Sequence, residues 1–228
     1  MLSVLNENLD SPEIIVVDDA SSDDSPKQVA DLPVTVLRQE RRKGPAAARN
    51  KGLSVCQGEF IAFLDADDVL VRNGLRWRLD YLRENPIHFA VAGSIAGVID
   101  SDAKPLHPHS EQTQNHFDTM PSIWSDTLLS TGRLFPSPLS LILFRRPAID
   151  TLGPMDESLF YASDVDYLHR LFRLGSFPFV NRGVMEYRLH EGNHSIESKN
   201  GIFVTRPAAV ASATLVSWQY GSPGPCSH

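Results

Sequence analysis

The sequence predicts an α/β fold built on a doubly wound, mostly parallel sheet. Two short apolar runs, at residues 14–17 and 60–64, lack polar alternation and end abruptly in aspartates. Such runs are typical of strands that are buried on both faces of a parallel sheet. Apolar residues at helical spacing lie between and after them, at 44–55 and 73–84. The alternation of strand and helix through about residue 70 indicates this fold class.

The same patterns place the remaining elements in order along the chain. Leucines at helical spacing predict a helix at residues 1–8, and residues 21–24 supply N-cap chemistry for a short helix. Residues 100–122 are polar and contain prolines, which predicts a long surface loop of the kind that holds a variable binding surface. We expect further strands at 34–37, 89–99, 139–144 and 177–189, further helices at 147–152, 164–174 and 206–218, and a frayed tail from residue 221.

Composition limits the classes of function. The 228 residues suit one domain, and 42% of them are hydrophobic, which is enough for a full core. The net charge of −7, with no basic run longer than Arg41–Lys43, argues against nucleic-acid binding.

Cys56 and Cys226 lie far apart, so neither a disulfide framework nor a cysteine metal pair is expected, and a reducing, cytoplasmic compartment is indicated. No apolar run approaches the ~20 residues that span a bilayer, and residues 1–10 do not form a signal peptide. Peripheral association with the inner face of a membrane is compatible with this composition.

Acidic residues follow two of the predicted strands. Asp18 and Asp19 come directly after the run at 14–17, and Asp65 and Asp67 come after the run at 60–64. In open α/β sheets, ligands bind beyond the carboxyl ends of the strands. We therefore expect both acidic groups at one edge of the sheet, and the active site at that edge.

Asp65 and Asp67 are candidates for holding a divalent cation. Carboxylates two residues apart at a turn can share a hard cation, and Mg²⁺ or Mn²⁺ binds such oxygens together with substrate phosphates. The ion would neutralise a departing diphosphate. The alternative is that these aspartates only cap the next helix, and the spacing by itself leaves both interpretations open.

Asp18 and Asp19 also allow several interpretations. Together with Ser21 and Ser22, they can cap the next helix. A phospho-accepting receiver domain likewise has an acidic pocket after a strand, and Asp65 could be its phosphorylated residue. That alternative requires a lysine at a matching later position, and no convincing lysine follows Asp65.

The segment from Gly44 to Asn50 opens a helix beside a basic group. A helix N-terminus near Arg49 and the basic residues 41–43 is suited to binding a diphosphate. The alternative is a solvated basic turn, which is the commoner case for three adjacent charges.

Two further residues are candidates for chemistry. Asp164 opens the helix at 164–174 and is a candidate general base, because deprotonating a hydroxyl needs a carboxylate within hydrogen-bond reach. N-capping is the alternative, and we prefer it for Asp166. His190 could be a third metal ligand or a phosphate contact, although a lone loop histidine is more often neither.

Four segments together resemble the inverting glycosyltransferases of family 2, which have the GT-A fold with a Rossmann-like sheet. The motifs are weak singly, but their order and spacing are specific, and the resemblance spans about residues 2–195. They are residues 12–23, with the acidic uracil-side contact; 44–52, similar to the family's Gly-x-Ala-x-Ala-Arg-Asn-x-Gly helix; 58–68, with an Asp-x-Asp motif; and 144–166, similar to the acceptor-side region that ends in the catalytic base.

The resemblance implies a nucleotide diphosphate sugar as the donor, often a uridine one, and a glycan, lipid-linked or small-molecule acceptor. It implies single displacement with inversion at the anomeric carbon, with Asp164 as the base and Mn²⁺ or Mg²⁺ holding the diphosphate. The residues assigned to the donor are Asp18, Asp19, Arg49 and Asp65, and those assigned to the metal are Asp67, Asp68 and His190.

The chain departs from the family pattern in two places. The family begins with a central strand that contributes to the nucleobase pocket, whereas this chain starts inside the following helix. We expect its first strand to be missing, either because the start codon is misassigned or because the chain is a truncated remnant. We therefore expect the strand at 14–17 to lack one hydrogen-bonded neighbour. Ser163 stands where the family commonly has Glu before the base. A truncated, non-catalytic relative that at most binds nucleotide is the second hypothesis. The expected division is a GT-A domain at 1–205 and a C-terminal helix and tail at 206–228.

Overall fold

The computed structural model describes residues 2–7, 9–23, 25–108, 139–159, 162–175, 177–189, 195–197, 203–205 and 212–218. Within these segments, the main sheet has nine strands in the order β2-β1-β11-β3-β7-β5-β8-β4, with β6 paired to β5. Its strands are β1 (Glu13–Asp18), β2 (Thr35–Arg38), β3 (Phe60–Asp65), β4 (Val69–Leu70), β5 (Ala90–Ile99), β6 (Pro105–Pro108), β7 (Ile142–Arg145), β8 (Phe179–Arg188) and β11 (Ser212–Trp218). A separate pair consists of β9 (Ser195–Glu197) and β10 (Phe203–Thr205).

The α/β class is confirmed, but the sheet is mixed rather than mostly parallel. Strands β1, β2, β3, β5 and β8 run in one direction. β11 and β7 run the other way and lie between them, so most neighbouring pairs are antiparallel. The prediction that neighbouring strands are mostly parallel was wrong. A short buried strand has the same apolar composition whether its neighbours are parallel or antiparallel, so the sequence did not reveal their direction.

β11 occupies the position between β1 and β3 and is antiparallel to both. Leu215 pairs with Ile15 of β1 on one side and with Phe63 of β3 on the other. The expectation that β1 lacks a neighbour is therefore wrong, because β2 and β11 flank it. The helix predicted over 206–218 is also wrong for the seven residues of β11, and residues 206–211 lie outside the described part of the chain. β11 belongs to the main sheet.

Ser217 ties the far end of β11 to both of its neighbours. Its hydroxyl accepts a hydrogen bond from the Gly58 N–H at 3.3 Å and donates one to Glu13 at the start of β1. Glu13 also accepts a hydrogen bond from the Gln57 N–H at 2.8 Å. Ser217 is fully buried, so these contacts satisfy a polar group that would otherwise destabilise the sheet.

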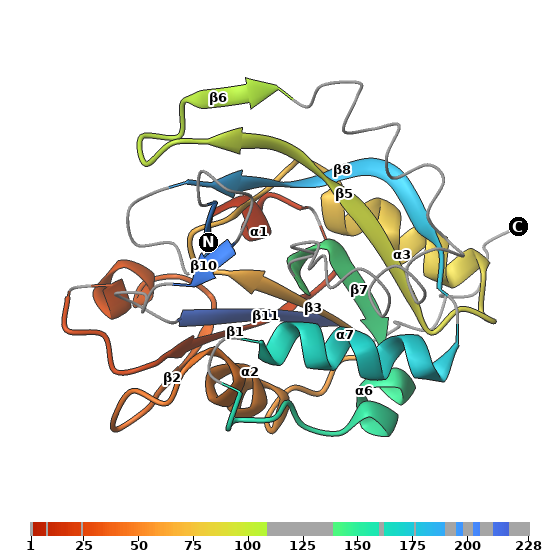
Figure 1. Ribbon diagram of the computed structural model, residues 1–228, viewed down its shortest axis with the longest axis horizontal. Helices are drawn as coiled ribbons and strands as arrows, with labels where there is room; N and C mark the ends of the chain where they lie inside the picture. Colours follow the sequence, from red (N-terminus) through yellow and green to blue (C-terminus); the bar gives the residue numbers. More distant parts are fainter. Residues whose placement is uncertain are drawn as a thin grey trace, which may run out of the picture.

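Helices cover both faces of the curled sheet (Figure 1). α2, α6 and α7 lie together on one side, and α3 packs against β5 and β8 on the other. None of the helices in the described residues has the length and apolar character needed to cross a membrane. The helical elements are α1 (Leu2–Leu5), the 3-10 turn η1 (Ser25–Val29), α2 (Pro45–Leu53), α3 (Gly74–Glu84), the 3-10 turn η2 (Leu139–Leu141), α6 (Arg146–Leu152) and α7 (Ser163–Leu174).

An aromatic cluster seats α7 on the sheet. The fully buried ring of Tyr167 meets Phe63 of β3 at 6.4 Å and Phe144 of β7 at 6.3 Å, both in edge-to-face geometry. Such contacts stabilise aromatic pairs beyond their buried area. Because Tyr167 lies one turn after Asp164, this cluster fixes the start of α7 above the sheet.

Most predicted elements are confirmed, with bounds that shift by a few residues. The strands expected at 14–17, 34–37, 60–64, 89–99 and 177–189 and the helices expected at 44–55, 73–84, 147–152 and 164–174 are present. The run at 139–144 begins as a 3-10 turn before β7. The loop predicted at 100–122 contains β6, and its remainder from residue 109 lies outside the described residues.

Candidate active site

The carboxyl ends of three strands bring charged side chains to one edge of the sheet. β1 ends in Asp18, β3 in Asp65 and β8 in Arg188. The two acidic groups therefore lie at one edge, as the sequence predicts. The start of β11 separates them, since Ser212 pairs with Asp18 and Ala213 pairs with Asp65.

Arg49 joins two of the predicted site residues. Its Nη2 donates a hydrogen bond to Asp65 Oδ1 at 2.7 Å, and its side chain is 7% exposed. Burial works against the charge of Arg49, but the negative charges of Asp65 and Asp164 outweigh burial and raise the pKa of Arg49. The guanidinium therefore stays charged, bonded to the end of β3 and attracted by the carboxylate of Asp164 at the start of α7.

Asp68 is the most deeply buried carboxylate of the Asp65–Asp68 turn. Its Oδ1 accepts a hydrogen bond from the Arg188 N–H at 3.3 Å, whereas its buried Oδ2 has no hydrogen-bond partner. Burial, followed by the negative charges of Asp65 and Asp67, raises the pKa of Asp68 to about 9. Burial, followed by the negative charges of Asp68, Asp67 and Asp65, raises the pKa of the neighbouring Tyr187. The turn therefore concentrates three carboxyl groups in a small, partly buried volume.

The Asp65–Asp68 turn fits the chemistry of a hard divalent cation. A cation would relieve the repulsion that raises the pKa of Asp68, and the unbonded Oδ2 of Asp68 is a suitable oxygen ligand. Within the described part of the chain, no three His, Cys, Asp or Glu side chains are arranged to hold a metal. Phosphate oxygens of a donor would complete the coordination, as they commonly do for Mg²⁺.

Asp19 lies at the N-terminus of α2 and already has several hydrogen bonds. Its Oδ1 accepts from Gln39 Nε2 and the Lys43 N–H, and its Oδ2 accepts from the Gly44 N–H, all at 2.8 Å. The side chain is buried, and its negative charge suits the positive end of the helix dipole. A diphosphate at this helix start would compete with Asp19 for the same N–H groups.

Asp18 holds the turn after β1 and, among the residues that the structure describes, does not contact the first residues of the next helical element, which begins at Ser25. It accepts a hydrogen bond from the Ser21 N–H at 2.9 Å and lies 3.3 Å from Arg38 Nε. Asp18 is buried, so its carboxylate stabilises the turn after β1 rather than facing open solvent. The side chains of Arg41 and Arg42 nearby are exposed, as expected for a solvated basic turn.

Asp164 and Asp166 have different surroundings at the start of α7. Asp164 Oδ1 accepts a hydrogen bond from the Val165 N–H at 2.8 Å, and its charge acts on Arg49. Asp166 instead forms an ion pair with Arg170 at 2.9 Å. Asp166 therefore has a structural partner in Arg170 instead of the predicted N-cap contact, since no side chain at the N-cap position caps α7. Of the two aspartates, Asp164 is the one whose charge acts on Arg49.

The structure adds residues that the sequence did not single out. Arg188 donates hydrogen bonds to the Asp67 carbonyl at 2.8 Å and to the Asp100 carbonyl at 2.9 Å, so it braces the acidic turn. Its place at the carboxyl end of a strand is the one signal that could have identified it. Asn50 belongs to the Arg-Asn-x-Gly part of the motif at 44–52, but the sequence assigned it no role. His190 lies outside the described residues.

Comparisons with known proteins identify the family of the chain. The family model described as glycosyl transferase family 2 matches residues 1–136. A Mycobacterium tuberculosis protein named pre-mycofactocin glycosyltransferase is 33% identical over 173 residues, which are 72% of this chain and 34% of that protein. An Escherichia coli protein named UDP-Glc:alpha-D-GlcNAc-diphosphoundecaprenol beta-1,3-glucosyltransferase is 39% identical over 90 residues, 38% of this chain and 36% of that protein. The chain thus spans about a third of the length of these relatives.

A solved structure shares the fold. The crystal structure of residues 1–349 of S. aureus TarS superposes with a TM-score of 0.60 over 82% of this chain and 55% of the TarS chain. The sequence identity is 19%, so this similarity concerns the arrangement of strands and helices.

Proposed function

Because the chain belongs to glycosyl transferase family 2, we propose that it transfers a sugar from a nucleoside diphosphate donor to an acceptor hydroxyl, with inversion at the anomeric carbon. The observation that carries this proposal is the contact of Arg49 with Asp65, together with the charge of Asp164 on the same guanidinium. In this proposal Asp65 is the donor-side carboxylate and Asp164 the base, and the charges of both act on Arg49. The name of the E. coli relative includes a UDP sugar, which supports a UDP sugar as the donor.

Asp164 would act as the general base. In an inverting transfer, the acceptor oxygen attacks the anomeric carbon from the face opposite the leaving diphosphate. The base and the diphosphate site must therefore lie on two sides of the sugar. Asp164 belongs to α7 and Asp65 to β3, so the two carboxylates that act on Arg49 come from different elements, which is compatible with this arrangement.

Asp67 and Asp68 would hold Mn²⁺ or Mg²⁺ together with phosphate oxygens of the donor. When bound, such an ion neutralises the charge that develops on the leaving diphosphate. Arg188 donates a hydrogen bond to the Asp67 carbonyl and so restrains the backbone that carries these carboxylates. Asp19 would contribute by ordering the loop before α2, which lies on the donor side.

The acceptor is proposed from a relative alone. The E. coli relative is named for a diphosphoundecaprenol-linked acceptor, which favours a glycan on a lipid carrier here as well. Such an acceptor would bring the protein to the inner face of the membrane as a peripheral protein. A small-molecule acceptor is the other candidate.

The test measures release of nucleoside diphosphate from a panel of UDP and other nucleotide sugars in the presence of Mn²⁺, with water or glycan acceptors. We expect turnover that EDTA abolishes and that Asp67→Ala lowers to background. The matched control is Asp80→Ala, which removes a half-exposed carboxylate of α3 that is paired with Arg76. Undiminished turnover in EDTA would contradict the proposed chemistry. Absence of turnover and of calorimetric nucleotide binding would favour the non-catalytic relative.

A further inference from the structure

Asn50 follows Arg49 in α2 and makes three hydrogen bonds to a distant segment. Its Nδ2 donates to the Met155 carbonyl and to Glu157 Oε1, both at 2.9 Å, and its Oδ1 accepts from the Met155 N–H at 2.8 Å. Only an amide side chain supplies both donors and an acceptor in this geometry. Residues 152–157, which we call the linker, connect α6 to the approach of α7, so Asn50 fastens α2 to this linker.

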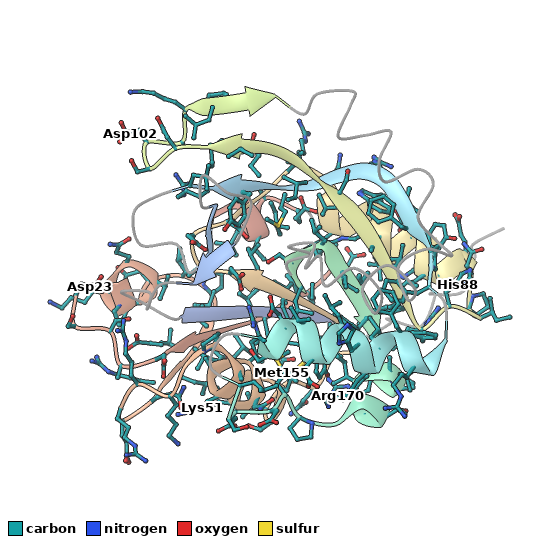
Figure 2. All side chains as sticks on the ribbon, in the orientation of Figure 1. Asp23, Lys51, His88, Asp102, Met155 and Arg170 are labelled. Atoms are coloured by element: carbon teal, nitrogen blue, oxygen red, sulfur yellow. The ribbon has the colours of Figure 1, made fainter. Side chains whose placement is uncertain are left out.

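The linker is also fastened to α7. Arg170 Nη1 donates hydrogen bonds to the Leu152 carbonyl at 2.7 Å and to the Pro154 carbonyl at 3.0 Å. Its Nε donates to Asp166 Oδ2 at 2.9 Å within α7. Figure 2 shows Met155 and Arg170 in the same region, beside α2 and α7. The linker therefore lies between two helices and is hydrogen-bonded to each of them.

Consecutive residues of α2 thus contact the two parts that an inverting transfer must align. Arg49 contacts Asp65 at the end of β3, on the donor side. Asn50 holds the linker, and Arg170 holds the linker to the helix that begins with Asp164. A displacement of α7 relative to β3 would change the separation of the base from the donor site.

We propose that Asn50 is a positioning residue, which sets the place of the Asp164 helix relative to Arg49 and Asp65 through the linker. This inference rests on the proposed function. Asn50 touches no reacting group, so its loss should impair the chemical step and leave donor binding intact. A misplacement of about 1 Å in a catalytic group can lower the rate roughly 100-fold.

The test uses four variants of the full chain. Asn50→Ala removes all three hydrogen bonds. Asn50→Asp keeps the acceptor for the Met155 N–H but places a carboxylate against the Met155 carbonyl and Glu157. Adding Glu157→Gln to Asn50→Asp supplies an amide at position 157 that can donate to the new carboxylate. Asn85→Asp is the matched control, because Asn85 donates to the Tyr81 carbonyl at the end of α3, away from the site.

We expect kcat for nucleoside diphosphate release to fall roughly 10- to 100-fold in Asn50→Ala and Asn50→Asp, with the donor KM within about 3-fold of wild type. The double variant should regain at least about 10-fold over Asn50→Asp, because its two substitutions restore one of the lost hydrogen bonds. Asn85→Asp should leave both constants unchanged. Hydrogen exchange should increase at Met155 and in the first turn of α7 in Asn50→Ala.

The outcomes separate this inference from the function on which it rests. If the wild type turns over and Asn50→Ala keeps its kcat, the positioning role is refuted and the proposed function stands. A matching rise in donor KM, or no recovery in the double variant, would also refute the role, because a general loss of structure predicts both. No turnover by the wild type with any donor would refute the proposed function, and the positioning role with it.

Discussion

Gly52 of α2 and Leu215 of β11 are in direct contact. A Cβ atom placed on Gly52 would lie 2.4 Å from Leu215 Cδ1, which is closer than carbon atoms can approach. Leu215 is fully buried between β1 and β3 and has little room to move. The absence of a side chain at position 52 therefore allows α2 to lie close to β11, and α2 carries both Arg49 and Asn50.

Gly52→Ala should destabilise the protein despite the better helix propensity of alanine. The substitution gains about 1 kcal/mol of intrinsic helix stability, whereas overpacking a buried contact typically costs about 1–3 kcal/mol. We expect a net loss of about 1 kcal/mol in the free energy of unfolding, measured by urea denaturation.

Leu215→Ala provides the second arm of a double-mutant cycle. Alone, it should cost about 2–5 kcal/mol, because it leaves a cavity in the centre of the sheet. In a protein that already carries Leu215→Ala, Gly52→Ala should leave the free energy of unfolding unchanged or raise it. The coupling free energy between the two substitutions should be at least about 1 kcal/mol. Strictly additive effects would show that β11 does not lie against α2 in solution.

The case of β11 shows what the sequence could and could not indicate about the fold. The runs at 14–17 and 60–64 identified β1 and β3 because an unbroken apolar run that ends in aspartates can be recognised from the local sequence alone. Residues 212–218 have no such signature, since their assignment depends on pairing with strands about 150 to 200 positions earlier. The helical prediction therefore failed where tertiary pairing overrides local propensity.

Glu7→Ala should destabilise the protein more strongly than its position near the N-terminus suggests. Glu7 is buried, and its Oε2 accepts hydrogen bonds from the N–H groups of Leu75 at 2.6 Å and Arg76 at 3.3 Å, at the start of α3. Its charge also faces the fully buried Arg78. Loss of a buried partner for charged and backbone groups costs about 2–4 kcal/mol.

Thermal and urea unfolding would measure this effect. The control Glu84→Ala removes an exposed carboxylate at the other end of α3 and should change stability by less than about 0.5 kcal/mol. Equal effects of the two substitutions would mean that Glu7 does not hold α3 in place.

Arg49→Met should separate metal binding from donor use. Without the guanidinium, Asp65 faces the other carboxylates alone, so Mn²⁺ affinity measured by calorimetry should rise roughly 3- to 10-fold, in line with about 1 kcal/mol of charge interaction. The donor KM should instead rise at least about 10-fold, since a positive charge next to the diphosphate site is lost. Arg76→Met, which breaks an exposed ion pair with Asp80, is the control and should change neither value. Unchanged Mn²⁺ affinity in Arg49→Met would indicate that the cation binds away from Asp65.

The candidate site residues that lie at the carboxyl ends of strands could be predicted from the sequence. Asp65, Asp67 and Asp68 follow a strand with a clear signature, and Arg49 belongs to a helix that opens with Gly-Pro. The contacts of Asp19 with the loop before α2 were not predictable, because they join backbone N–H groups about 25 positions away. Asn50 lies in the motif at 44–52, but its contacts were not predictable for the same reason, since its partners lie 105 and 107 positions later.

Asp164→Asn should abolish most of the transfer activity while leaving the fold and donor binding intact. The amide has nearly the same shape, and its carbonyl can still accept the Val165 N–H, so the start of α7 should be preserved. It cannot accept a proton from the acceptor hydroxyl, and loss of general base catalysis lowers kcat by about 10²- to 10⁴-fold. Steady-state kinetics should show this fall with the donor KM within about 3-fold of wild type. Asp150→Asn, at an exposed position on α6, is the control for removing one negative charge nearby. If Asp164→Asn retains the wild-type kcat, the base must be another residue. The electrostatic interaction of Asp164 with Arg49 would then have a structural role only.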